Sequence, residues 1–144
     1  MKCRVRAIVR KGNELLLVQH KNPAGESTSA WALPGGGVED GEMIIDALQR
    51  EMIEETGIAP QIGDLRFIHQ FKRNGIYEGP EFFFEVINSE DYDTIDLSRT
   101  THGLHEIARI GFFEPQNLDG LLPEFLKDKI LLQSKQIQII INED

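Results

Sequence analysis

The fold of this chain is decided by the stretch WALPGGGVEDGEMIIDALQREMIEETGI, which covers residues 31–58. Three consecutive glycines lie in its first half, and residues 42–56 then run without Gly or Pro. This run is rich in helix-forming residues, and Gly57 follows it at a position typical of a helix C-cap. The stretch therefore predicts a glycine-rich turn that leads into a helix over residues 42–56.

The predicted helix carries two kinds of side chain on neighbouring faces. At about 100° per residue, its apolar residues fall on one flank, which we expect to pack on a sheet. That flank consists of Ile44, Ile45, Leu48 and Met52. Glu51, Glu54 and Glu55 share the adjacent strip, because residues at i, i+3 and i+4 are neighbours on a helix. Three carboxylates are thus expected to face one small region.

Such a concentration of like charge favours a metal ion. Carboxylates this close repel one another, and Mg²⁺ relieves the repulsion because it prefers oxygen ligands and retains waters that phosphate oxygens can replace. Arg50 reaches Glu54 at i+4, which orients one carboxylate and offsets part of the charge. A solvated acidic face with one ion pair is the competing interpretation. The position of the cluster behind a glycine-rich turn favours the metal.

The same stretch resembles the signature of the MutT-like Nudix hydrolases. That signature is G-x5-E-x7-R-E-U-x-E-E-x-G-U, with U apolar, and residues 36–58 match it at every fixed position. From average residue usage, a chance match has odds on the order of 10⁻⁷. The resemblance implies the Nudix α/β/α sandwich, an α/β fold in which the motif helix covers one side of a mixed β-sheet and a C-terminal helix covers the other. It also implies hydrolysis of a nucleoside diphosphate linked to another moiety.

The resemblance assigns roles to individual residues. The implied ligands of Mg²⁺, which Mn²⁺ can replace, are Glu51, Glu54, Glu55 and the carbonyl oxygen of Gly35. Arg50 is expected to orient the catalytic carboxylates, with Glu42 and Gly36 directly around them. The general base is left open between Glu54 and Glu106. Glu106 precedes an apolar, aromatic segment, as a late acid of the family does, and is also a candidate for an additional metal ligand.

Two arginines near the N-terminus are candidate substrate-binding residues. Arg4 and Arg6 lie on the first predicted strand at a spacing of two, so their side chains point to the same face. They either bind a substrate phosphate or base, or form the solvated side of an edge strand.

The length, composition and net charge of the chain limit the classes of protein to which it can belong. Its 144 residues suffice for one domain, residues 1–144, with a core that needs no disulfide. The single Cys3 and the lack of a long apolar run or signal-like segment favour a cytoplasmic protein without a membrane partner. A formal net charge of −9 argues against a nucleic-acid surface. The expected partner is a small nucleotide, and a homodimer is compatible with the sequence.

Alternation and turn residues predict the remaining elements. Strands are predicted at residues 3–9, 14–20, 65–71, 77–88, 105–113 and 136–141, a helix at 124–133, and loops at 21–30 and 89–105. The run Phe82-Phe83-Phe84 indicates a central strand buried on both faces. In the C-terminal helix, Phe125, Ile130 and Leu131 are expected to pack on the sheet.

Two other functions are compatible with the resemblance. A catalytically silent nucleotide sensor or regulatory domain commonly has substitutions among the motif acids, and this chain has none. Hydrolysis of capped RNA is disfavoured by the acidic charge. Among small nucleotides, the family's proline marker for ADP-ribose is absent after the motif. The sequence therefore favours nucleoside triphosphates or small nucleoside diphosphate derivatives.

Overall fold

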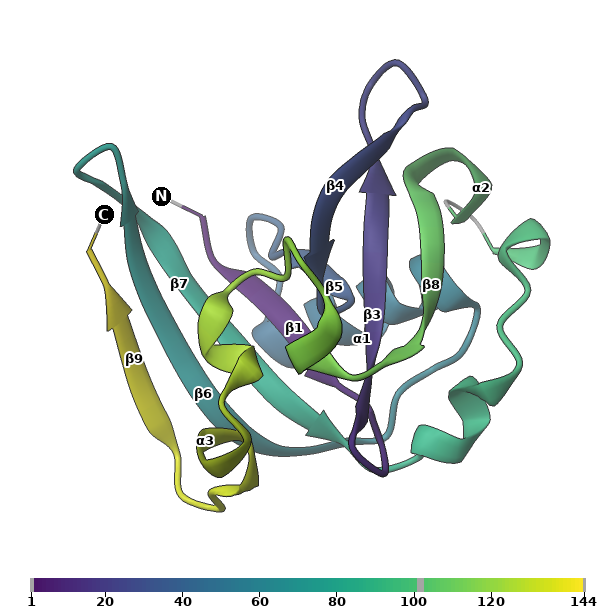
Figure 1. The fold of residues 1–144 in the computed structure, drawn as a ribbon. Helices are drawn as coiled ribbons and strands as arrows, with labels where there is room; N and C mark the ends of the chain where they lie inside the picture. Colours follow the sequence, from purple (N-terminus) through teal and green to yellow (C-terminus); the bar gives the residue numbers. More distant parts are fainter. Residues whose placement is uncertain (1, 101–102, 144) are drawn as a thin grey trace.

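The computed structural model describes residues 2–100 and 103–143, and in these residues the strands form two β-sheets (Figure 1). The first sheet has the strand order β5-β1-β7-β6-β9. It consists of β5 (Gly35–Gly37), β1 (Arg4–Ile8), β7 (Ile76–Val86), β6 (Ile62–Arg73) and β9 (Gln138–Asn142). The pairs β1/β7 and β6/β9 are parallel, whereas β1/β5 and β6/β7 are antiparallel, so the sheet is mixed.

The second sheet is antiparallel and is built around one strand. β3 (Glu14–Lys21) pairs with β2 (Arg10–Lys11), β4 (Ser27–Ala32) and β8 (Ile107–Phe113). The helices are α1 (Ile44–Thr56), α2 (Gly103–Glu106) and α3 (Lys129–Gln133), and the connections contain 3₁₀ turns at Ser89–Asp93, Leu97–Arg99, Pro115–Asn117 and Glu124–Lys127. None of the described helices is both long and apolar enough to cross a membrane.

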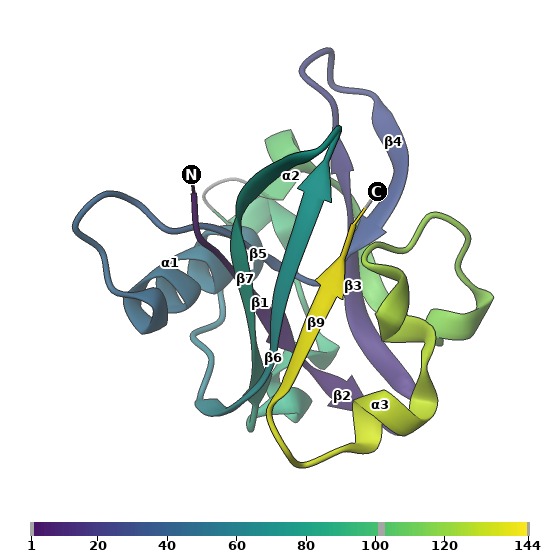
Figure 2. The ribbon, with the colours of Figure 1, turned by 90° about the vertical axis from the view of Figure 1, so that its left-hand side faces the viewer.

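The core consists of two apolar clusters, one on each face of the first sheet. Val5 and Ala7 of β1 belong to the cluster under α1, together with the helix residues Leu48 and Met52. Ile8 of the same strand belongs to the other cluster, which includes residues of the C-terminal segment. This division follows from the alternation of side chains along a strand. Figure 2 shows α1 and α3 on opposite sides of the sheet.

These observations confirm the predicted α/β fold with a mixed sheet. The central strand is also confirmed, because β7 lies between β1 and β6, and Phe83 and Phe84 contribute to the clusters on its two faces. α1 ends as predicted at Thr56, and Gly57 follows it in the left-handed conformation with φ of 76°. This backbone region is the one that glycine adopts at helix ends without steric cost.

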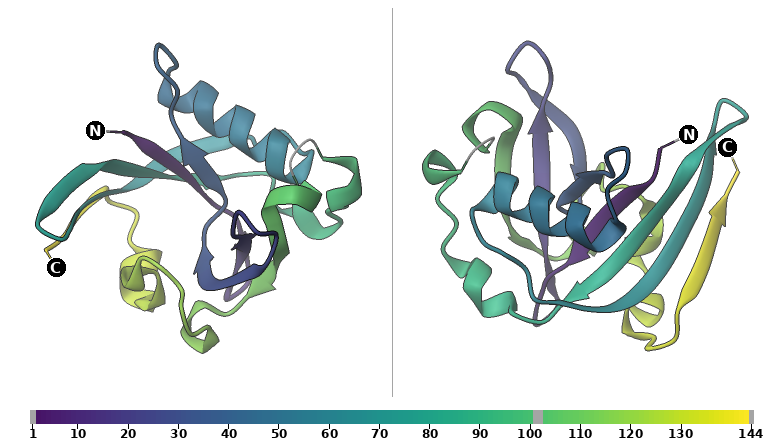
Figure 3. Two further views of the ribbon diagram at one scale, coloured as in Figure 1. Left: turned by 90° about the horizontal axis from the view of Figure 1, so that it is seen from above. Right: turned by 180° about the vertical axis from the view of Figure 1, so that it is seen from behind.

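The start of the helix and one of its predicted contacts are wrong. α1 begins at Ile44 rather than at residue 42, because the preceding residues form a turn in which Glu42 N–H donates to the Glu39 carbonyl at 3.0 Å. Ile44 packs against the core, but the side chain of Ile45 is 41% exposed and does not join it. Figure 3 shows α1 lying across the sheet from above and from behind.

Two other predicted boundaries are wrong, one because of strand pairing and the other because of a helix cap. Residues 27–30, expected in a loop, belong to β4, which pairs with β3. The predicted helix at 124–133 is interrupted at Asp128, whose side chain accepts hydrogen bonds from Ile130 N at 3.0 Å and Leu131 N at 3.1 Å and so begins α3 anew. Leu131 packs on the core as predicted, whereas Ile130 is 85% exposed.

Candidate active site

Arg50 is the hub of the acidic cluster on α1. Its Nε donates to Glu42 Oε2 at 2.9 Å, and its Nη1 donates to Glu51 at 3.1 Å. The same Nη1 lies 3.3 Å from Glu54 Oε2, as the i, i+4 spacing predicted. Nη2 donates to the Gly37 carbonyl at 3.0 Å. One guanidinium therefore connects the helix, the turn before it and β5.

Glu42 is held as a carboxylate by these contacts. Hydrogen bonds from Arg50, and after them one from the backbone of Glu39, lower its pKa from 4.5 to about 2. The pKa of the Arg50 guanidinium is in turn raised, chiefly by its hydrogen bonds with Glu42. The two groups form a fixed ion pair that borders the remaining acids and does not titrate near neutral pH.

Glu51 occupies the space that a side chain at position 36 would fill. A Cβ atom on Gly36 would lie 2.5 Å from the Glu51 carboxyl group, closer than real Cβ atoms approach. Burial raises the pKa of Glu51, and hydrogen bonding to Arg50 opposes that shift. Gly36 thus allows a carboxylate to lie directly on the glycine strand.

Glu55 is the most buried acid of the cluster, with only 3% of the residue exposed. Its Oε2 is buried without a hydrogen-bond partner. Burial, and then repulsion from Glu51, raise its pKa from 4.5 to about 8, while a hydrogen bond with the Gly35 backbone acts in the opposite direction. A buried carboxylate with one unpaired oxygen is costly and calls for a cation or a proton.

The donor set fits a divalent cation, although the described residues contain no group of three or more His, Cys, Asp or Glu side chains already arranged to hold one. Glu51 and Glu54 both contact Arg50, and Glu55, whose Oε2 is unpaired, is close enough to Glu51 for the two charges to repel. Acids whose pKa values are raised by burial and mutual repulsion are the groups that a hard cation stabilises as carboxylates.

Glu106 comes close to this cluster from a different element. It ends α2 rather than beginning the strand, which starts one residue later at Ile107. α2 contacts α1. Its charge is among the influences that raise the pKa of Glu55, after burial and Glu51. The fold therefore brings Glu106 near Glu55, the most buried acid of the cluster.

His20 is a nearby residue that sequence reasoning missed. It lies in β3, and burial, followed by the charge of Arg6, lowers its pKa, while Glu106 raises it. Its position before the polar loop gave no signal, since a histidine at a strand end is common on protein surfaces.

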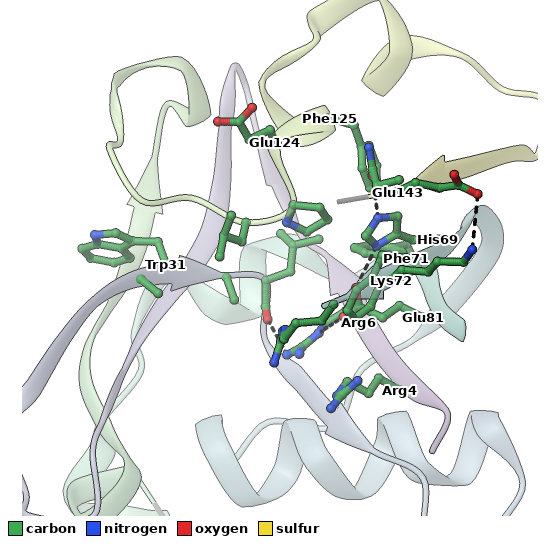
Figure 4. Close-up of a pocket in the computed structure, with 18 residues that line it drawn as sticks. Arg4, Arg6, Trp31, His69, Phe71, Lys72, Glu81, Glu124, Phe125 and Glu143 are labelled. Atoms are coloured by element: carbon green, nitrogen blue, oxygen red, sulfur yellow. Dashed lines mark hydrogen bonds and ion pairs between the residues drawn. The ribbon is translucent and has the colours of Figure 1, made fainter. Parts of the chain in front are cut away.

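A cavity of about 510 Å³ lies on the face of the first sheet opposite α1 (Figure 4). Arg4 and Arg6 line it from β1, and their side chains lie on one face of the strand as their spacing predicted. Arg6 Nε donates to Glu81 Oε2 at 3.1 Å, and its Nη1 donates to the Leu33 carbonyl at 3.2 Å. Arg6 thus connects the cavity to the residues just before the glycine strand.

The opposite wall of the cavity is aromatic and is held by one hydrogen-bonded histidine. His69 Nδ1 lies 3.0 Å from Glu81 Oε1, and Nε2 lies 2.7 Å from Asn142 Oδ1. The His69 ring stacks on Phe71 with centroids 5.0 Å apart and planes at 19°, and Phe125 lies 5.4 Å from it. Figure 4 shows these three rings together.

Sequence reasoning missed this wall, because its residues come from distant parts of the chain. His69 lies on β6, Glu81 on β7 and Asn142 on β9, and only the register of the sheet makes them neighbours. The alternation of His69 and Phe71 along one strand face was the available signal, and it did not reveal their partners.

Comparison with known proteins gives consistent results. The family model described as NUDIX domain matches residues 2–132. The chain is 38% identical to an ADP-ribose pyrophosphatase of Methanocaldococcus jannaschii over 77 residues, 54% of this chain and 40% of that protein. It is 26% identical to an RNA pyrophosphohydrolase of Novosphingobium aromaticivorans over 110 residues, 67% of each. The chain therefore spans less than half of the first relative and two thirds of the second.

Solved structures share the fold. A MutT protein from Bacillus halodurans superposes with a TM-score of 0.70 at 21% identity, covering 99% of this chain and 90% of that one. The solution structure of the E. coli ORF135 protein gives a TM-score of 0.65 at 25% identity, covering 88% and 84%.

Proposed function

The chain belongs to the NUDIX family, and from this premise we propose that it is a Mg²⁺-dependent hydrolase of nucleotide pyrophosphate bonds. The substrate is a nucleoside diphosphate linked to another moiety. The observation that carries the proposal is the buried, unpaired Oε2 of Glu55 beside Glu51 and the glycine strand, because this arrangement needs a cation to be stable as a carboxylate.

The residues that would hold the cation are Glu51, Glu54, Glu55 and the carbonyl group of Gly35. When bound, Mg²⁺ supplies Lewis-acid stabilisation of the charge that develops on phosphate oxygens. Arg50 keeps Glu51 and Glu54 oriented through contacts of 3.1 and 3.3 Å. Glu42 fixes Arg50, and Gly36 leaves room for Glu51.

A carboxylate removes the proton from the attacking water. We assign this step to Glu54 or Glu106. Glu54 lies on α1 beside Arg50, whereas Glu106 reaches the cluster from α2. Replacing each residue separately by glutamine, with kcat measured over a range of Mg²⁺ concentrations, distinguishes them. Loss of the general base lowers kcat even at saturating Mg²⁺, whereas loss of a metal ligand also raises the Mg²⁺ concentration that the reaction needs.

The cavity on the other face is the proposed site for the organic part of the substrate. Its volume of about 510 Å³ suits a small molecule. Arg4 and Arg6 are proposed to bind the substrate there, at the boundary with the glycine strand. The favoured substrates are nucleoside triphosphates and small nucleoside diphosphate derivatives.

A substrate panel tests the proposal. Purified protein is incubated with nucleoside triphosphates, ADP-ribose, dinucleotides and nucleotide sugars, with Mg²⁺, with Mn²⁺ and with chelator. We expect product from at least one class with either metal and none with chelator. Tight nucleotide binding without product under every condition would instead support the catalytically silent sensor.

The 5′ end of RNA is a second candidate substrate, because the Novosphingobium relative carries the name RNA pyrophosphohydrolase. The net charge of −9 opposes extensive contact with RNA beyond the first nucleotide. A short 5′-triphosphorylated RNA and the matching nucleoside triphosphate separate the two classes. A kcat/KM that is higher for the RNA and falls steeply with salt would favour RNA.

The proposal also includes a single domain over residues 1–144 and action in the cytoplasm, where the lone Cys3 would remain reduced. It holds for a monomer and for a homodimer, since every residue assigned above comes from one chain. Sedimentation in solution would establish which state is present.

A further inference from the structure

β9 forms one edge of the five-stranded sheet, and its outer side is open. The strand pairs with β6, and no strand of the described residues pairs with its other side (Figure 1). Such an edge presents a row of backbone N–H and C=O groups without a partner strand. The opposite edge of the same sheet is β5, which has only three residues. β9 is therefore the longer open edge of this sheet.

The sequence of this edge lacks the features that normally prevent strand pairing. Residues 136–142 read QIQIIIN and contain no charged residue, proline or glycine. The register of β9 with β6 is regular over all five residues of the strand, so no bulge twists the edge away. Natural edge strands are usually protected by charges, proline or bulges. A β-branched edge without any of these favours pairing with another chain.

The side chains of β9 on the α1 face of the sheet are exposed and apolar. Ile140 packs against the core cluster on the cavity face, so the alternate residues Ile139 and Ile141 point to the α1 face. Ile139 is 63% exposed and Ile141 is 65% exposed. Ile137, just before the strand, is 57% exposed. Neighbouring exposed apolar side chains of this size are typical of interaction surfaces.

Ile139 is the outer end of an apolar row that crosses three strands. Ile139 lies beside Ile68 of β6, and Ile68 lies beside Phe82 of β7. Phe82 packs against the cluster under α1, whereas the helix itself contacts β1 and β5. The view from behind in Figure 3 shows β6 and β9 beyond the helix. The row thus begins at the core and ends uncovered at the edge of the sheet.

A second copy of this chain matches both the edge and the row. A two-fold axis perpendicular to the sheet makes two β9 strands antiparallel and keeps the two α1 faces on the same side. With Ile139 on the axis, Ile139 lies opposite itself and Ile137 lies opposite Ile141 of the second copy. The flanking charges agree with this direction. Antiparallel strands bring Lys135 toward Glu143 of the second copy, whereas parallel strands would bring like charges together.

We propose that β9 is a homodimer interface, in which the β9 strands of two copies pair antiparallel about a two-fold axis at Ile139 and join the two sheets into one. The apolar row of Phe82, Ile68 and Ile139 then continues into the same row of the second copy. The contact uses the open edge of both copies, so assembly closes at two. The inference goes beyond the proposed function and does not depend on it, because none of the proposed metal ligands lies on β9.

Sedimentation equilibrium of the full chain over a range of concentrations tests the interface. We expect a monomer–dimer equilibrium with a dissociation constant of about 1–100 µM, as suits an interface built on one pair of strands. Ile139→Lys places like charges opposite each other at the axis and removes an apolar contact. It should raise the dissociation constant about 10-fold or more. Ile130→Lys is the matched control, because this isoleucine of α3 is 85% exposed, and should change the constant by less than about twofold.

Disulfide cross-linking tests the register of the two strands. With Ile139 on the axis, the cysteine of Ile139→Cys lies opposite its own copy within reach of a disulfide, so oxidised glutathione should give a covalent dimer. Ile140→Cys should not cross-link, because it points to the other face and lies opposite Gln138 of the second copy. The wild type, whose single cysteine is Cys3, gives the background.

The outcomes that overturn the proposal are distinct. A wild type that is monomeric at about 1 mM has no such interface. A dimer that Ile139→Lys leaves intact, or an assembly larger than two copies, uses another surface. Cross-linking of Ile140→Cys in place of Ile139→Cys contradicts the axis at Ile139. If Ile139→Lys does not fold, as circular dichroism would show, Ile139→Thr replaces it. Ile139→Thr keeps the strand propensity and should weaken the dimer several-fold, and an unchanged dissociation constant overturns the role of the apolar row.

Discussion

The two faces of the five-stranded sheet carry sites of opposite construction. On the α1 face, an acidic cluster is built almost entirely from residues 35–55, and its charges are oriented by one arginine. On the other face, a net basic cavity collects residues from β1, β4, β6, β7 and β9. The comparison shows that a site contained in one turn and one helix can be read from spacing, whereas a site assembled across a sheet depends on strand register. It also predicts that substitutions on the first face impair turnover and those on the second impair binding.

The largest effect is expected on the acidic face. Glu54→Gln should lower kcat by about 10²- to 10⁴-fold, because it removes a candidate general base and a proposed metal ligand together. The measurement is steady-state product release at saturating substrate and Mg²⁺. Glu39→Gln is the control, since this carboxylate is 66% exposed and lies 3.7 Å from the same Arg50. A large loss in Glu106→Gln with none in Glu54→Gln moves the base to Glu106, and no loss in either contradicts the division between the faces.

Glu55, the buried acid on the α1 face, should make the stability of the metal-free protein depend on pH. Because the pKa of Glu55 is raised to about 8 in the folded protein, the folded state holds more protons than the unfolded state above pH 4.5. The free energy of unfolding should therefore fall as pH rises from about 5 to about 9, by an amount on the order of a few kcal/mol.

Thermal unfolding in chelator measures this dependence. Glu55→Gln should flatten the curve, and added Mg²⁺ should restore the stability of the wild type at high pH. If the free energy of unfolding of the wild type instead rises between about pH 5 and about pH 9, Glu55 is ionised at little cost in the folded protein. The argument for a cation at Glu55 would then fail.

Substitutions in the cavity should weaken substrate binding and leave the rate of the chemical step unchanged. Phe71→Ala should raise KM by about 5- to 50-fold, with kcat within about twofold, because stacking of a base on an aromatic side chain contributes about 1–3 kcal/mol. Ile76→Ala is the matched control, as this apolar residue of β7 is 66% exposed and does not line the cavity. A fall in kcat at unchanged KM would mean that the two faces do not divide the work as described.

The smallest effect concerns the ion pair at the edge of the acidic face. The pKa of Glu42 is lowered to about 2 by Arg50, so its contribution to stability is present above pH 4.5 and is lost as the pH falls toward 2. Glu42→Gln should lower the melting temperature slightly at neutral pH and remove this part of the acid dependence. Asp64→Asn, with a side chain that is 82% exposed, should leave the acid dependence as it is.

Sequence reasoning succeeded where neighbouring positions determine the outcome. The end of α1 at Gly57, the burial of Leu48 and Met52, and the reach of Arg50 to Glu54 all follow from helical geometry. It failed where distant contacts or local capping decide. The polar residues at 27–30 became strand because β3 offered them partners, and the C-terminal helix was interrupted because the side chain of Asp128 caps a new start.

The cavity was the least predictable feature for the same reason. His69, Glu81 and Asn142 are ordinary residues in their local sequence, and their hydrogen bonds exist only because β6, β7 and β9 pair in one register. Arg4 and Arg6 could be placed on one face, but their different surroundings depend on which side chains arrive from other strands.

One feature of β1 limits which molecules can span the two sites. The strand presents Val5 and Ala7 to the cluster beneath α1, and its intervening arginines to the cavity, so five residues of backbone anchor both. A paired strand in the middle of a sheet does not stretch, and the separation between the carboxylates and the cavity is consequently constant. A substrate bound at both places, as proposed, would therefore be selected by its length, and a compound with one phosphate more or fewer between its ends would have to bend or lose its contacts at one end.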